Sequence, residues 1–149
     1  MKIKEALHAY CLELIRERIE RIQREIGLVQ SSANEETKSS AGDKYETGRA
    51  MAQQEIDLRK RQLLEAETLL NTLFNVKPKA SGEVATHGSL VSTSNGIFYL
   101  AIGIGLVTYN KNQYYVISPN SPVGKQLMGK KEGDTLQVNE VDHIIHSIE

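Results

Sequence analysis

The sequence contains almost none of the residues from which disulfide frameworks and cysteine metal clusters are made. Cys11 is the single cysteine among 149 residues, which excludes an intramolecular disulfide and a cysteine-ligated cluster. No apolar run approaches the roughly 20 residues that a membrane-spanning helix needs. The N-terminal segment carries charges every few residues and lacks the apolar core of a signal peptide. These absences predict a cytoplasmic protein with no membrane partner.

An excess of charge of one sign is also missing, and aromatic side chains are few. The formal net charge is −1, and the chain has no tryptophan and only 5% aromatic residues. A protein of this composition does not hold nucleic acid by bulk positive charge. It also has few aromatic platforms on which bases stack. Any contact with RNA or DNA is therefore expected to be local, or arranged by a partner protein.

Proline is absent from the first half of the chain, and its distribution marks a domain boundary. All three prolines and eight of the eleven glycines lie beyond Lys77. The earlier part has helical patterning, whereas the later part has β-branched runs. The sequence therefore predicts an α+β protein with two domains, a helical one over residues 1–76 and a β-rich one over residues 77–149.

Apolar residues recur at steps of three and four in two segments of the first domain. This spacing is typical of a coiled-coil seam. The stripes are most simply buried against each other as a long antiparallel hairpin, with helices of about 30 residues and about 45 Å. The first stripe contains Ile3, Leu7, Cys11, Ile15, Ile19, Ile22, Ile26 and Val29, and the second contains Ala52, Ile56, Leu63, Ala66, Leu70 and Leu73.

A polar segment, residues 30–49, separates the two stripes, and Tyr45 is its one sizeable apolar side chain. Such a segment cannot bury a core, so it is expected to form the solvated tip of the hairpin, at about residues 35–49. A turn is expected around Gly42, and Asp43 is suited to cap the returning helix. The tip would carry four acids: Glu35, Glu36, Asp43 and Glu46.

The second domain is predicted to be a small antiparallel β-domain with one helix. Strict alternation of apolar residues over residues 98–106 predicts one strand with a buried face. Residues 114–117, 136–138 and 141–148 are further candidate strands. Ser121 followed by Pro122 predicts a helix over residues 122–128, which Gly129 would end.

Residues 117–138, read as ISPNSPVGKQLMGKKEGDTLQV, resemble the C-terminal domain of the Gre transcript-cleavage factors. The shared features are a serine-proline pair, a helix ending in leucine and glycine-lysine, and a glycine-aspartate before a strand. The resemblance implies an FKBP-like fold without prolyl-isomerase activity. The tip sequence GDKYE is similar to the Gre tip in its glycine and in the spacing of Asp43 and Glu46. The residues between and after these acids differ from those that are usual in the family.

The resemblance implies a transcription elongation factor that binds RNA polymerase through the C-terminal domain and inserts the hairpin tip into the secondary channel. There Asp43 and Glu46 would act as catalytic and metal-binding residues, sharing Mg²⁺ with the polymerase, whose own active site would cut backtracked RNA. The protein would not be an enzyme by itself, would meet the nascent RNA 3′ end only indirectly, and would be a monomer when free. The expected polymerase-binding residues are Ser118, Pro119, Asn120, Ser121, Pro122, Lys125, Lys130 and Lys131.

Other interpretations of these residues remain open. An acid at the start of a helix is often only a cap or a partner of the helix dipole. The divergent tip is compatible with a secondary-channel regulator that does not promote cleavage, as in the Rnk and DksA types or the Gre-related inhibitors. A third alternative is a coiled-coil interaction module. The mixed charges along both helices, among them Arg21, Glu25 and Arg59, either line a channel for RNA or form a solvated surface.

Overall fold

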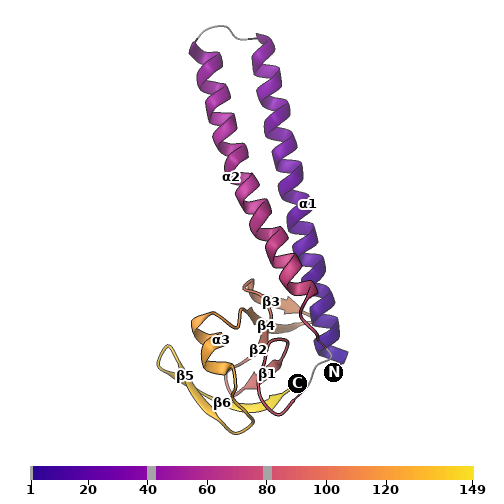
Figure 1. The fold of residues 1–149 in the computed structure, drawn as a ribbon, viewed down its shortest axis with the longest axis vertical. Helices are drawn as coiled ribbons and strands as arrows, with labels where there is room; N and C mark the ends of the chain where they lie inside the picture. The colour runs from indigo at the N-terminus through magenta and orange to yellow at the C-terminus, as the bar shows by residue number, and fades with distance from the viewer. Residues whose placement is uncertain (1, 40–42, 79–81) are drawn as a thin grey trace. The chain divides into compact units, whose positions relative to one another are not determined.

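The computed structural model describes residues 2–39, 43–78 and 82–149, with side chains for residues 3–35, 46–78 and 82–149 (Figure 1). The contacts divide the chain into two compact units. One is Glu13–Leu70, and the other combines Met1–Leu12 with Asn71–Glu149. Within the described ranges, none of the helices has an apolar stretch that would let it cross a membrane.

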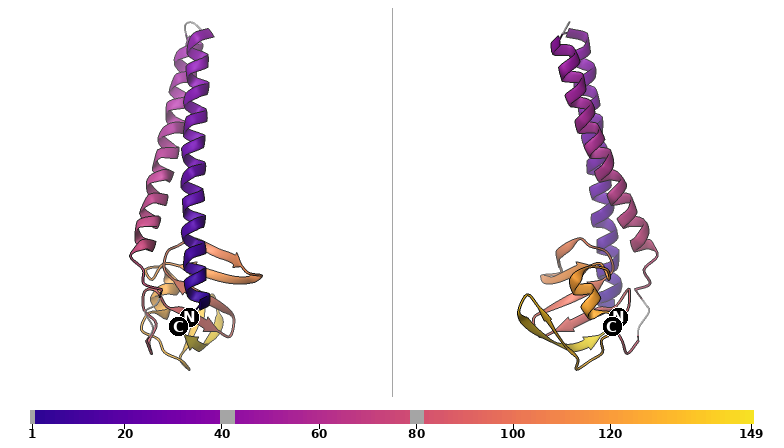
Figure 2. Two further views of the ribbon diagram at one scale, coloured as in Figure 1. Left: turned by 90° about the vertical axis from the view of Figure 1, so that its right-hand side faces the viewer. Right: turned by 60° about the vertical axis from the view of Figure 1, so that its left-hand side comes forward.

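The first unit is an antiparallel hairpin formed by residues 13–39 of helix α1 (Lys2–Ser39) and residues 43–70 of helix α2 (Asp43–Phe74). The two helices run side by side in opposite directions (Figures 1 and 2). The buried side chains between them are Ile15 and Ile22 from α1 and Ile56 and Ala66 from α2, all members of the predicted stripes. The predicted hairpin is therefore confirmed, and apolar burial along one helical face explains its formation.

Toward the tip the seam of the hairpin becomes less buried. Beyond Ile22 on α1 and Ile56 on α2, no described side chain of the hairpin is fully buried, and Val29 and Ala52 are half-buried. Most of the polar segment is nevertheless helical, because α1 continues to Ser39 and α2 begins at Asp43. The expected turn at residues 40–42 lies outside the described residues, as does the side chain of Asp43.

The second unit is built on a six-stranded sheet with strand order β3-β4-β2-β1-β6-β5. The sheet is mixed, so the prediction of an antiparallel domain is wrong at one pair: β2 and β4 are parallel. The chain reaches that arrangement because β3 lies at the edge, and β4 returns between β3 and β2. The elements are β1 (Leu90–Thr93), β2 (Gly96–Leu100), β3 (Gly105–Tyr109), β4 (Asn112–Ile117), α3 (Pro122–Leu127), β5 (Thr135–Val138) and β6 (Val141–Ile148).

The single strand predicted over residues 98–106 is also wrong, because the chain divides there into β2 and β3. Between them the N–H of Ile104 bonds back to the carbonyl of Ile102 at 3.2 Å, and Gly105 adopts a φ of +85°. That left-handed conformation favours glycine and turns the chain toward the sheet edge. The other predicted strands fall within β4, β5 and β6, whereas β1 was not predicted.

The two faces of the sheet are covered by different helices. On one face, α3 packs Leu127 into a core that includes Phe98 and Leu100 of β2. On the other face lies the start of α1, where His8 Nδ1 and the Tyr99 hydroxyl form a 2.7 Å hydrogen bond. Residues 1–12, which the sequence places in the hairpin domain, thus belong to the compact unit of the sheet. The stripe does not extend to Ile3, which is 55% exposed.

Cys11 lies on this covered face and is fully buried. Burial penalises the thiolate and raises the pKa of the thiol to about 12. The same desolvation, assisted by Cys11, raises the pKa of Tyr99. A thiol of this kind is a small packing residue and not a nucleophile, as the apolar stripe predicted.

The buried pair of His8 and Tyr99 predicts a loss of stability in acid. Burial lowers the pKa of His8 from its usual 6.5. The unfolded chain therefore takes up a proton near pH 6.5, whereas the folded chain takes it up only at lower pH. The contribution of neutral His8 is complete above pH 6.5 and is lost progressively as the pH falls below it.

We expect the thermal midpoint to fall between pH 7 and pH 5, and to fall less in His8→Gln, which keeps a polar group but does not titrate. Scanning calorimetry of both proteins across that range measures the difference. Tyr99 and Cys11 remain neutral throughout, because their pKa values are raised. Parallel pH profiles for the two proteins would contradict the prediction.

Candidate functional site

The loop before α3 is fixed by side-chain hydrogen bonds to its own backbone. The Ser121 hydroxyl accepts from the N–H of Gly124 at 3.1 Å, which confirms Ser121 as the N-cap. The same hydroxyl donates to the carbonyl of Ser118 at 2.7 Å, and Ser118 Oγ accepts from the N–H of Asn120 at 3.1 Å. The two serines therefore shape the loop instead of being held free for a partner.

Gly124 in α3 lies directly against this loop. A Cβ at that position would overlap the carbonyl oxygen of Ser118 and would lie 2.9 Å from both the Cα of Pro119 and Oγ of Ser121. Two of these atoms belong to the backbone and cannot rotate away. The position therefore requires glycine, since only a residue without a side chain lets the helix pack so close to the loop.

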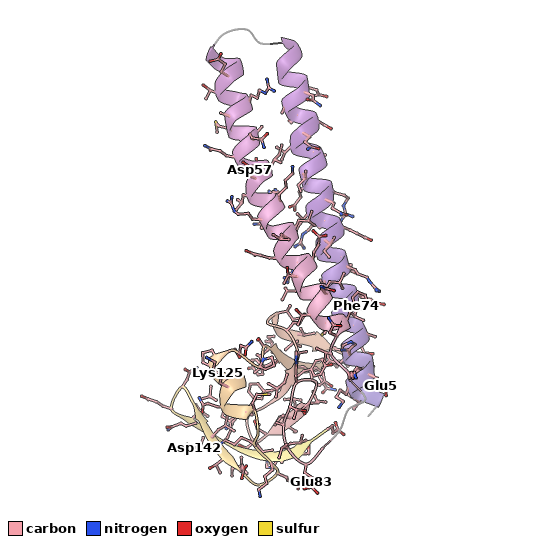
Figure 3. All side chains as sticks on the ribbon, in the orientation of Figure 1. Glu5, Asp57, Phe74, Glu83, Lys125 and Asp142 are labelled. Atoms are coloured by element: carbon pink, nitrogen blue, oxygen red, sulfur yellow. The ribbon has the colours of Figure 1, made fainter. Side chains whose placement is uncertain are left out.

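The eight predicted polymerase-binding residues all lie between residues 118 and 131, and we call them the 118–131 surface. Asn120, Pro122, Lys125 and Lys131 are exposed, and the other four are half-buried. Figure 3 labels Lys125 on α3. The Lys131 N–H donates to Asp134 Oδ2 at 2.9 Å, which ties the end of the stretch to the turn before β5. The structure thus presents a rigid loop and a helix whose exposed side chains include two cations.

At the hairpin tip, Glu46 is exposed in the first turn of α2, three residues from Asp43. Among the described residues there is no group of three or more His, Cys, Asp or Glu residues that could hold a metal ion. Magnesium binds through one or two carboxylates together with waters and phosphate oxygens. Glu46 fits such shared coordination, but the described residues do not form a complete site, so a metal at this position would require ligands from a partner.

Midway along the hairpin, four charged residues form a network across the seam. Arg59 of α2 donates from Nη1 to Glu25 of α1 at 2.6 Å and from Nη2 to Glu55 at 3.2 Å. Arg21 Nε lies 3.9 Å from Glu25. Beside the network is a hollow of about 300 Å³, which is also lined by Arg18 and other residues of both helices. The seam therefore has a polar layer that the apolar stripes did not predict.

A second hollow of about 460 Å³ lies closer to the tip, between the same two helices. Leu28 and Met51 beside it are 71% and 64% exposed. Its lining residues are Leu28, Val29, Ser32, Ala33, Gly48, Met51, Ala52 and Glu55.

The fold defines a protein with a helical hairpin and a mixed-sheet domain that presents a capped loop and helix. Residues 107–148 match the family model of the C-terminal domain of the transcription elongation factors GreA and GreB. The Gre resemblance predicted from residues 117–138 is therefore confirmed as a similarity over residues 107–148. The structure of the transcription factor Gfh1 is similar at 23% sequence identity, with 92% of each chain covered and a TM-score of 0.39. No curated protein matches the chain.

The structure adds two features that the sequence interpretation had missed. Gly124 sits inside the recognised motif, but its role follows only from the close approach of α3 to Ser118. Arg59 and Glu25 were grouped with surface charges, although their side chains are only 28% and 33% exposed. Their arrangement with Arg21 and Glu55, at i and i+4 on each helix, was the available signal. His143 is buried and His146 is exposed.

Proposed function

We propose that the protein is a Gre-type transcription elongation factor that binds RNA polymerase and stimulates cleavage of backtracked RNA. The match of residues 107–148 to the GreA/GreB C-terminal domain is the observation that carries the proposal. The long hairpin with an exposed acid, Glu46, in the first turn of α2 supports it. We place the protein in the cytoplasm, as a monomer when free, with the polymerase as its partner.

The C-terminal domain is the proposed polymerase-binding part, through the 118–131 surface. Its loop is already ordered by the Ser118 and Ser121 hydrogen bonds, so little conformational entropy is lost on docking. Lys125 and Lys131 are exposed and provide positive charge for an acidic partner. Because residues 1–12 pack in the same compact unit, binding is best tested with the full chain and not with residues 77–149 alone.

The hairpin tip is the proposed cleavage-promoting part, placed in the secondary channel of the polymerase. Asp43 and Glu46 would contribute carboxylate oxygens to magnesium shared with the polymerase, and that metal supplies activation of water for phosphodiester hydrolysis. The cleaving active site is that of the polymerase, so the protein acts in trans. The nascent RNA 3′ end is met only within that complex.

A secondary-channel regulator that does not promote cleavage is the second candidate function. This second function is favoured because the tip sequence around Asp43 and Glu46 differs from the usual Gre sequence. The deciding experiment is an assay of RNA shortening in stalled elongation complexes with and without the protein. RNA shortening supports the first candidate. Binding without shortening, combined with altered pausing or initiation, supports the second.

Reversing the charges of Lys125 and Lys131 is expected to weaken polymerase binding. The variant Lys125→Glu/Lys131→Glu should lose about tenfold in affinity at low salt, because each exposed pair contributes up to about 1 kcal/mol. The difference should shrink as salt screens the charges. Lys111→Glu, an exposed reversal in the β3–β4 turn, is the matched control. Equal affinity of the double variant and the control, measured by fluorescence anisotropy, would place the docking surface elsewhere.

A further inference from the structure

The four charges across the hairpin seam, Arg21, Glu25, Glu55 and Arg59, form what we call the charge square. On each helix the two members lie four residues apart, with the acid and the base in opposite order: Arg21 then Glu25 on α1, and Glu55 then Arg59 on α2. Two pairs are within a helix, and Glu25 with Arg59 joins the helices at 2.6 Å. This pattern has a different electrostatic energy in each helix register.

In the observed register, Arg59 lies beside Glu25. Four residues make about one helical turn, so sliding α2 by one turn changes which positions face each other. In one direction the slide brings Glu25 opposite Glu55 and Arg21 opposite Arg59, which creates two like-charge contacts in place of an ion pair. In the other direction it brings Arg59 opposite Val29 and Glu25 opposite Leu63, so both charges lose their cross-helix partners. Neither neighbouring register keeps the ion pair between the two helices.

Apolar packing does not select the register in the half of the hairpin nearer the tip. No described side chain beyond Ile22 and Ile56 is fully buried there. The hollow of about 460 Å³ lies between the helices there, and its large apolar lining residues, Leu28 and Met51, are mostly exposed, so a displacement by one turn costs little apolar burial. The charge square is therefore the feature with a strong preference for one alignment in this half.

We propose that Glu25 and Arg59 are positioning residues that hold α1 and α2 in one register. They thereby fix the position of Glu46 along the axis of the hairpin, relative to α1. Nε of Arg59 is buried without a hydrogen-bond partner, so the pair is not arranged for greatest stability. Polar groups in a coiled-coil seam are known to specify alignment at a cost in stability. What the tip does rests on the proposed function, but the alignment itself does not.

Cysteine pairs near the tip test the register directly. Ser32 and Ala52 lie at facing levels in the observed register, whereas Ser32 and Gly48 face each other after a slide of one turn. Under mild oxidation, Ser32→Cys/Ala52→Cys should cross-link about tenfold more than Ser32→Cys/Gly48→Cys, since several charge contacts of the usual size separate the registers. Cys11 does not interfere, because it is buried and its pKa is raised to about 12.

Arg59→Glu should abolish this preference, because the new acid is repelled by Glu25 in the observed register. In the displaced register its attraction to Arg21 offsets the repulsion between Glu25 and Glu55. Arg61→Glu makes the same charge change at an exposed position outside the square and should leave the cross-linking ratio unchanged. Glu25→Gln/Arg59→Gln removes both charges without adding apolar side chains that would pack against each other in the observed register. It should remain helical, yet bring the two cross-links within about twofold. Circular dichroism of each variant monitors folding.

The functional readout separates positioning from simple stability. With Arg59→Glu or the double glutamine variant, we expect the maximal rate of stimulated cleavage to fall about tenfold or more at unchanged polymerase affinity, because displaced catalytic groups lose rate steeply. An unchanged cross-linking ratio in Arg59→Glu, or an equal change in Arg61→Glu, overturns the register proposal. If the parent protein stimulates no cleavage, the proposed function fails while the cross-linking result still decides the register.

Discussion

Replacing Glu46 with alanine is expected to reduce stimulated RNA cleavage about a hundredfold while leaving polymerase affinity nearly unchanged. Loss of one charged ligand at a metal-assisted transition state costs on the order of 3 kcal/mol. Glu46 is exposed in the free protein and contributes little to the proposed docking surface. Single-turnover cleavage in stalled complexes, with binding measured separately, gives both quantities.

Two comparisons distinguish metal binding from helix capping at the tip. Asp43→Asn keeps a capping side chain but removes the charge, so it should impair cleavage almost as strongly as Asp43→Ala if the carboxylate binds magnesium. If Asp43 is only an N-cap, asparagine should serve nearly as well as aspartate. Raised magnesium should partly restore the single variants by mass action.

The matched control for Glu46 is Glu67→Gln, an exposed acid far along the same helix, which should cleave at the parental rate. A parental rate of stimulated cleavage with Glu46→Ala would show that Glu46 takes no part in the mechanism. The regulator interpretation would then be favoured, provided that the protein still binds polymerase and changes pausing or initiation.

Gly124→Ala is expected to destabilise the C-terminal unit by about 3 kcal/mol or more, at the upper end of the cost of overpacking. The new methyl group would meet the carbonyl oxygen of Ser118 and the Cα of Pro119, and backbone atoms cannot relieve the overlap by changing rotamer. For a domain of this size the thermal midpoint should fall by roughly 10–20 °C. Polymerase binding should weaken as well, because relief of the overlap displaces the loop of the 118–131 surface.

Gly103→Ala is the control for that substitution. A Cβ at Gly103 meets nothing within 4 Å, so its thermal midpoint should remain close to that of the parent. Calorimetry of the two variants side by side checks the prediction. A Gly124→Ala protein with the parental midpoint and affinity would show that the loop can shift away from α3 without cost.

The sequence alone determined the elements whose signals are local. Steps of three and four along Ile15, Ile22 and Ile56 predicted the hairpin, because one helical face has to bury its apolar stripe. Ser121 and Pro122 located the start of α3, since the cap satisfies backbone donors within the same turn. The motif in residues 117–138 predicted the similarity to the GreA/GreB C-terminal domain, because its residues form one loop and one helix that follow each other in the sequence.

The turns at Asn110-Lys111 and Asn139-Glu140 show where local signals become weak. Both turns have positive φ at their two central residues, between 50° and 68°, and join β3 to β4 and β5 to β6. Neither contains the glycine that usually marks such turns. Asparagine tolerates this conformation, so the hairpins form although the sequence signal for them is faint.

Only the tertiary structure decided which strands pair, and in which direction. Alternation over residues 98–106 reports a buried face but not a partner, so one predicted strand became β2 and β3, with β4 parallel to β2. Residues 2–12 are the start of α1, yet His8 and Cys11 are buried in the unit of the sheet. The closeness of Glu25 and Arg59, and of Gly124 and Ser118, likewise depends on how separate segments meet. Periodicity indicates on which face of its own helix or strand a residue lies. Contacts between residues that are distant in the sequence depend on how the whole chain packs.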